Sequence, residues 1–271
     1  MSELPGWLPL AVKILFPALT VVSATALAER SGPLLAGIVM AMPVSIGPVY
    51  VMLALTAPPQ FVAASAVGSI AANLAVAAFG TVYVLLAPRL PMPASLAAAL
   101  VAWFGVAASM QHGWHPAAWL LALLGTAALV AATYLTRRAL AGRRLLAGAK
   151  RWYDLPLRAV FVGCFAAALV TASQAIGPGW TGMFAAFPLV LTSSIVLLHS
   201  RVGAAATAAA IATAIQGIVA YPAALYLLHR FCVGWGVWWA MLACLAAIVG
   251  WAGLVYWWRA ARAAPRPPAP A

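Results

Sequence analysis

Apolar runs of about twenty residues, almost free of charge, recur along this chain from one end to the other. A helix needs about 20 such residues to cross the hydrocarbon core of a bilayer. Barrel strands would instead alternate apolar and polar residues over about ten positions. The chain is therefore predicted to be all-α, a polytopic transmembrane helical bundle of about nine spans. The nine runs are 7–28, 33–56, 60–87, 93–110, 114–135, 156–175, 180–199, 202–228 and 236–258.

The overall composition agrees with a membrane protein. Hydrophobic residues make up 66% of the chain and charged residues 7%, whereas a soluble domain carries about 25% charged residues. Cys164, Cys232 and Cys244 are scattered and form no CxxC pair. They indicate small apolar helix residues, not a disulfide framework or a thiol metal site.

The positive charges predict an orientation. With nine spans, every Lys and Arg except Lys13 and Arg230 falls on one side of the membrane. The positive-inside rule then places the N-terminus outside and the C-terminus in the cytoplasm of a bacterial inner membrane. The net charge of +12 is thus a topology signal beside anionic lipid headgroups. Membrane lipids are expected partners, nucleic acid is not, and a homo-oligomer is compatible with the sequence.

The two halves of the chain repeat. A shift of 145 residues aligns about forty positions without a gap and places two glycines and two prolines on identical residues. The aligned pairs are Gly32 with Gly177, Pro33 with Pro178, Gly37 with Gly182, and Pro43 with Pro188. An odd number of crossings precedes the second unit, so it enters the membrane from the opposite face. The sequence therefore predicts two inverted four-helix repeats joined by a linker helix.

This repeat divides the chain into five expected regions. The basic stretch after the linker helix is expected to be a cytoplasmic loop, and the proline-rich end a disordered tail. The regions are 1–110 for the first four-helix repeat, 111–136 for the linker helix, 137–155 for the basic loop, 156–260 for the second repeat and 261–271 for the tail.

The first unit, from Lys13 through Met52, has a lysine near the start of its first helix and the charged pair Glu29-Arg30 at its end. An Ala-Gly-x5-Pro run, Ala36-Gly37 to Pro43, then opens the second helix. In these features it resembles the small GlpM-like bacterial membrane proteins, which are about half as long. The resemblance implies that two such units are fused here. It carries over no defined biochemical activity.

Prolines inside apolar helices mark the candidate site. Proline in a helix interior removes a backbone hydrogen bond, at a cost of about 3 kcal/mol. Interrupted helices at matching positions of inverted repeats are the usual sequence pointer to a transport site. A kink that serves packing alone is the competing interpretation, because adjacent hydroxyls repair such breaks. The candidate substrate-binding residues are Pro43, Ser45, Gly47, Asn73, Pro188, Thr192, Ser193, Ser194 and Gln216.

Among these, Asn73 and Gln216 are the polar pair expected deepest in the membrane. Either they face a cavity or they hydrogen-bond between helices. Lys13 and Arg158 lie one to two turns inside the first and sixth spans. They are expected either to reach the headgroups or to act as gating or vestibule residues that attract anionic solutes.

Catalytic chemistry is not indicated. The three acids, Glu3, Glu29 and Asp154, all lie outside the predicted span centres, which argues against a carboxylate relay and against paired-carboxylate hydrolysis. His112 and His115 lack a third metal ligand. His199 and His229 are expected at helix ends on opposite sides. We therefore expect no enzyme activity, no metal and no cofactor.

The leading hypothesis is a secondary transporter or facilitator for a small solute, with alternating access of the inverted repeats. The alternative is a non-transporting membrane scaffold or assembly partner. The sequence does not identify the solute.

Overall fold

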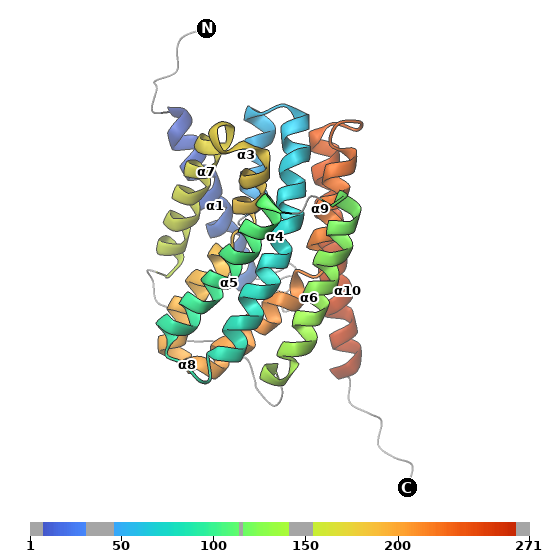
Figure 1. Ribbon diagram of the computed structural model, residues 1–271. Helices are drawn as coiled ribbons and strands as arrows, with labels where there is room; N and C mark the ends of the chain where they lie inside the picture. Colours follow the sequence, from blue (N-terminus) through green and yellow to red (C-terminus); the bar gives the residue numbers. More distant parts are fainter. Residues whose placement is uncertain (1–7, 31–45, 114–115, 141–153, 264–271) are drawn as a thin grey trace.

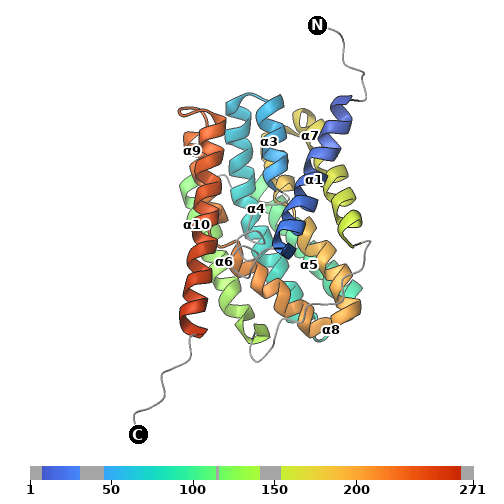
Figure 2. The same cartoon turned by 180° about the vertical axis from the view of Figure 1, so that it is seen from behind.

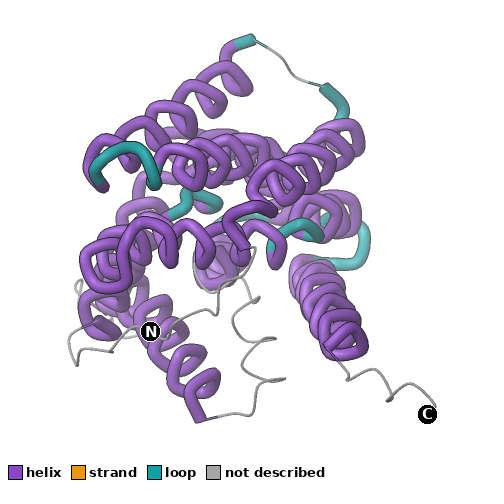
Figure 3. Tube along the Cα trace, turned by 90° about the horizontal axis from the view of Figure 1, so that it is seen from below, coloured by secondary structure: helices purple, strands orange, loops and turns teal. Residues whose placement is uncertain are grey.

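The computed structural model describes residues 8–30, 46–113, 116–140 and 154–263, and within these ranges all regular secondary structure is helical (Figures 1 and 3). The helices stand side by side as one bundle. They are α1 (Leu8–Arg30), α3 (Ile46–Thr56), α4 (Pro59–Leu86), α5 (Met92–His112), α6 (Ala118–Leu140), α7 (Asp154–Ala185), α8 (Leu189–Gly217), α9 (Tyr221–Phe231) and α10 (Val237–Ala263).

Prolines set the starts of several helices. Pro58 and Pro91 are the N-cap residues of α4 and α5, and α4 has a second proline, Pro59, in its first turn. Proline suits the first turn of a helix because an N–H there would have no partner within the helix and because the φ of proline is already helical. The predicted spans 60–87 and 93–110 therefore match α4 and α5 closely.

The central helix of the bundle is α4. It packs against α5, α6, α7, α8 and α9, and it lies between them in both side views (Figures 1 and 2). Ser65, Ser69 and Asn73 are buried along it, together with Phe79 and Tyr83. Small and polar residues at the centre allow close helix approach and interhelical hydrogen bonds in a membrane.

Six helices of the described chain are long and apolar enough to cross a membrane, which makes the protein a multi-pass helical membrane protein. One of the six stretches, Leu189–Phe231, covers 43 residues, and Ile46–Thr56 is a shorter apolar helix. Part of the second predicted span, 33–45, lies outside the described residues. The count of nine spans stays a prediction.

Two expected span boundaries lie at or near sharp kinks. The sequence separates spans at 176–179 and at 200–201, and the backbone turns sharply at Gly177 in α7 and at Gly203 in α8, so each of these helices consists of two helical segments. Gly177 has φ 77° and ψ 168°, and Gly203 has φ 81° and ψ 167°. Glycine tolerates this left-handed φ because it has no Cβ. The chain therefore turns within one residue, at the first expected boundary and two residues beyond the second.

The helices alternate in direction. In Figure 1, α4, α6 and α10 run downward, whereas α5, α9 and the first part of α7 run upward. The chain enters α1 from the top and leaves α10 at the bottom (Figures 1 and 2).

Candidate functional site

The candidate site is centred on the break between α7 and α8. α7 ends at Ala185, and Pro188 is the N-cap of α8, with φ −75° and ψ 51°. The Leu189 N–H donates to the Phe187 carbonyl at 2.7 Å, and the Thr192 N–H donates to the Pro188 carbonyl at 2.8 Å. The break lies between the kinks at Gly177 and Gly203, so it separates the short last segment of α7 from the first segment of α8.

Three hydroxyl residues follow in the first turns of α8. Ser193 Oγ donates to its own helix, at the Val190 carbonyl, 3.0 Å away. Thr192 Oγ1 is shielded from solvent and has no hydrogen-bond partner among the described residues. Ser194 is half-buried. A shielded hydroxyl without a partner costs about 1–3 kcal/mol, and the N-terminal N–H groups of a helix also lack partners within it. The start of α8 can therefore hydrogen-bond a polar group brought to it.

The second part of α7 crosses α4 at very close range. Ser69 Oγ donates to the Gly182 carbonyl at 2.6 Å, and the Tyr50 hydroxyl lies 2.7 Å from Ser69 Oγ. A Cβ added to Gly182 would overlap the Ser65 carbonyl oxygen, and one added to Gly68 would overlap the Gly179 carbonyl oxygen. Only glycine at both positions permits this crossing. α3, α4 and α7 are thereby held together directly before the break.

Asn73 lies one turn beyond Ser69 on α4. Its side-chain amide donates to the Ser69 carbonyl at 2.8 Å, and the residue is buried. Gln216 is half-buried near the end of α8, a helix that packs against α4. For Asn73, the structure therefore shows a hydrogen bond within its own helix.

The remaining predicted residues are distributed as follows. Gly47 lies in the first turn of α3, and Lys13 is half-buried in α1. Arg158 lies near the start of α7, and its side chain is outside the described part. Pro43 and Ser45 lie outside the described residues, so the predicted cavity between Pro43 and Pro188 stays a prediction.

Two histidines lie near the ends of helical segments. His199 lies about one turn before the kink at Gly203, which ends the first segment of α8, and its Nδ1 is 2.8 Å from the hydroxyl of Tyr83 on α4. His229 lies near the end of α9, where its Nδ1 is 2.9 Å from the Ala63 carbonyl. Both histidines thus join their helix to α4.

Sequence reasoning missed Ser69, Tyr50 and the Tyr83–His199 pair. A signal for the first existed: Ser65, Gly68 and Ser69 on one helix face, against Gly179 and Gly182 on another, form the small-residue spacing typical of close membrane helix crossings. The Tyr83–His199 pair has no comparable local pattern, because 116 residues separate its partners.

The polar side chains at the break are the hydroxyl residues Thr192, Ser193 and Ser194. The carboxylates of Glu3, Glu29 and Asp154 are all outside the described side chains. In the described part of the chain, no three His, Cys, Asp or Glu residues come together as a metal site would need. The Thr192 hydroxyl can hydrogen-bond a solute.

The fold and this site define a helical multi-pass membrane protein in which a break separates α7 from α8. Comparisons with protein-family models, with curated proteins and with solved structures find no match to the chain.

Proposed function

We propose that the protein is a secondary transporter or facilitator of a small solute in the bacterial inner membrane. The observation that carries the proposal is the interruption of the second half of the chain at Gly177, at Pro188 and at Gly203. Two left-handed glycines bracket a broken helix that starts beside unpartnered hydrogen-bonding groups. Discontinuous helices of this kind form the substrate sites of many transporters.

The chain directions support the inverted-repeat architecture. The first part of α7 runs opposite to α1, α9 runs opposite to α4, and α10 runs opposite to α5 (Figures 1 and 2). The 145-residue shift relates the first of these pairs, and the order of the four helices in each repeat relates the other two. In the proposed mechanism one unit rocks against the other, and Gly177 and Gly203 act as hinges, since glycine accommodates backbone changes at low cost. Fusion of two GlpM-like units is our proposed origin of this arrangement.

The arginines support the proposed orientation. Arg89 follows α4, and Arg137 and Arg138 lie in the last turn of α6; both helices end at the bottom of Figure 1. Arg230 lies in the last turn of α9, which ends at the top. In the proposal the lower face is cytoplasmic. Reporter fusions at residues 112 and 145 check this orientation: the first should report outside and the second inside.

The decisive variant is Thr192→Val, because it separates transport from packing. In a transporter the hydroxyl serves the solute, so the variant should lower flux into liposomes about tenfold. At the same time it should leave the free energy of unfolding unchanged or raised, since an unpartnered buried hydroxyl is removed. Solute-uptake profiling of a deletion strain supplies the solute for the assay. Thr213→Val is the matched control, because the Thr213 hydroxyl bonds within its own helix.

A labelling experiment needs no solute. In a background in which the three native cysteines are alanine, a membrane-impermeant maleimide should modify the cysteine of Thr192→Cys when it is added to either side of the membrane. Thr136→Cys, at a position 1% exposed in α6, should stay unmodified.

The scaffold hypothesis has one observation in its favour, the close packing of α4 against α7 through Ser69 and Gly182. It predicts that Thr192→Cys stays unlabelled and that Thr192→Val changes no flux. That pair of results would replace the transporter proposal with the scaffold.

A further inference from the structure

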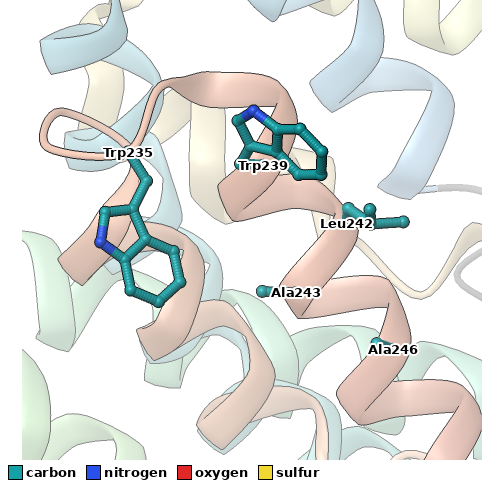
Figure 4. A pocket seen from close by; sticks show the side chains of 5 residues that line it. All are labelled: Trp235, Trp239, Leu242, Ala243 and Ala246. Carbon is teal, nitrogen blue, oxygen red and sulfur yellow. The ribbon is translucent and has the colours of Figure 1, made fainter.

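A groove lies on the outer side of the bundle, where the α9–α10 loop meets the start of α10. It is a shallow, open groove of about 510 Å³ and is lined by Trp235, Trp239, Leu242, Ala243 and Ala246. Figure 4 shows the indole of Trp235 on one side and α10 on the other, with the two alanines below Trp239. Trp235 and Trp239 are 58% and 67% exposed. The groove thus has aromatic walls and a small-residue floor.

The backbone builds this groove. Gly236 has φ 87°, a conformation that L side chains rarely adopt, and its carbonyl accepts the first α10 bond, from the Ala240 N–H at 3.1 Å. The Trp235 N–H meanwhile donates to the Phe231 carbonyl at 2.8 Å. The turn at Gly236 therefore holds Trp235 beside α10 and keeps the space between them open.

The position and length of the groove suit a lipid chain. It begins at the helix end, the depth at which tryptophans sit among headgroups. From Trp239 to Ala246 it descends about 10 Å along α10 toward the hydrocarbon. An occupant must therefore be narrow and apolar below and polar at the mouth.

A cation is connected to the Trp235 wall of the groove through Phe231. The Arg230 guanidinium carbon lies 5.9 Å from the Phe231 ring centroid, and the Phe231 ring stacks on Trp235 with centroids 4.0 Å apart and planes 18° apart. Arg230 is exposed and makes no ion pair with any described residue. A guanidinium presents paired N–H donors that match phosphate oxygens. This aromatic stack thus connects a phosphate-binding group to the wall of an apolar groove.

We propose that this groove is a binding site for an anionic glycerophospholipid, with the phosphate on Arg230 and one acyl chain between Trp235 and Trp239. The lipid belongs to the leaflet at the α9–α10 loop end of the bundle. The site is separate from the break between α7 and α8 and does not depend on the protein being a transporter.

Native mass spectrometry of the purified protein, titrated with phosphatidylglycerol in detergent, tests the site. Arg230→Gln should weaken retention of the first lipid about tenfold through loss of a charge-assisted contact. Ala246→Leu fills the floor without changing any charge, and it should weaken phosphatidylglycerol and phosphatidylcholine alike. Arg89→Gln is the matched control, because Arg89 is an exposed arginine at the opposite end of the bundle. This variant should retain the first lipid as well as the wild type does.

Equal retention by Arg230→Gln, Ala246→Leu and the control would overturn the proposal. So would a protein dimer that Ala246→Leu converts to monomer, since the groove would then be the contact between two copies. Monodisperse elution of each variant checks that it is folded.

Discussion

The helices α4 and α10 are almost equal in length, with 28 and 27 residues, and their most apolar windows have the same mean hydropathy. Yet 67% of that window is buried in α4 and only 28% in α10. The difference lies in which residues are used. α4 buries Ser65, Ser69 and Asn73, whereas α10 exposes Trp239 and Trp257.

In a lipid solvent, the mean hydropathy of a helix does not decide whether the helix lies at the centre of the bundle or at its surface. Hydrocarbon chains are as apolar as leucine, so no hydrophobic force draws one apolar helix inward before another. Close packing and hydrogen bonds decide instead, and both favour small and hydroxyl residues. α4 carries them on the faces that α7 and α9 contact, and α10 carries bulky indoles that suit the interface.

The largest expected effect is a difference in the free energy of unfolding between alanine substitutions at two glycines. Gly182→Ala places a methyl group against the Ser65 backbone on α4, and backbone cannot yield as a side chain can. We expect a loss of at least about 3 kcal/mol in the free energy of unfolding, measured by titration with a denaturing detergent. Gly250→Ala on α10, where nothing lies within 4 Å of the new atom, should change it by less than about 0.5 kcal/mol. Equal effects would abolish the distinction between the two helices.

An intermediate effect tests the hydrogen bonds of α4. Ser69→Ala removes the bonds to the Gly182 carbonyl and the Tyr50 hydroxyl, and we expect a loss of about 1–2 kcal/mol in the same titration. Ser109→Ala is the control, because that exposed serine bonds only to the Val106 carbonyl of its own helix. If the two variants lose the same amount, packing alone holds α4 at the centre.

The smallest effect concerns the link between α4 and α8. Tyr83→Phe removes the hydroxyl 2.8 Å from His199 and should cost about 1 kcal/mol, since interhelical hydrogen bonds in membranes are modest. Tyr134→Phe, at a position 59% exposed on α6, should cost less than about 0.5 kcal/mol. A loss above about 3 kcal/mol for Tyr83→Phe would show that this bond, and not the Gly182 crossing, is the main restraint.

Much of the fold was predictable because each helix must satisfy its own backbone in lipid. Length and apolarity alone indicated α4, α5 and α6, and prolines placed two of their starts. The breaks at Gly177 and Gly203 fall at or near predicted span boundaries, but their left-handed backbone conformation was not predictable, since a glycine in an apolar run can continue a helix or turn it. Of the candidate site, Pro188 and Thr192 do lie at a helix break, but Pro43 and Ser45 fall outside the described residues.

By itself the sequence determined that this chain is a bundle of membrane-crossing helices. Its long apolar segments lie in hydrocarbon, where a helix is one of the few structures that pair every polar group of the backbone. Only the tertiary structure decided which helix stands at the centre, and that Ser69 meets Gly182 and Tyr83 meets His199. Those contacts join residues more than a hundred positions apart, and in a uniformly apolar chain it is the fit of one surface to another that selects them.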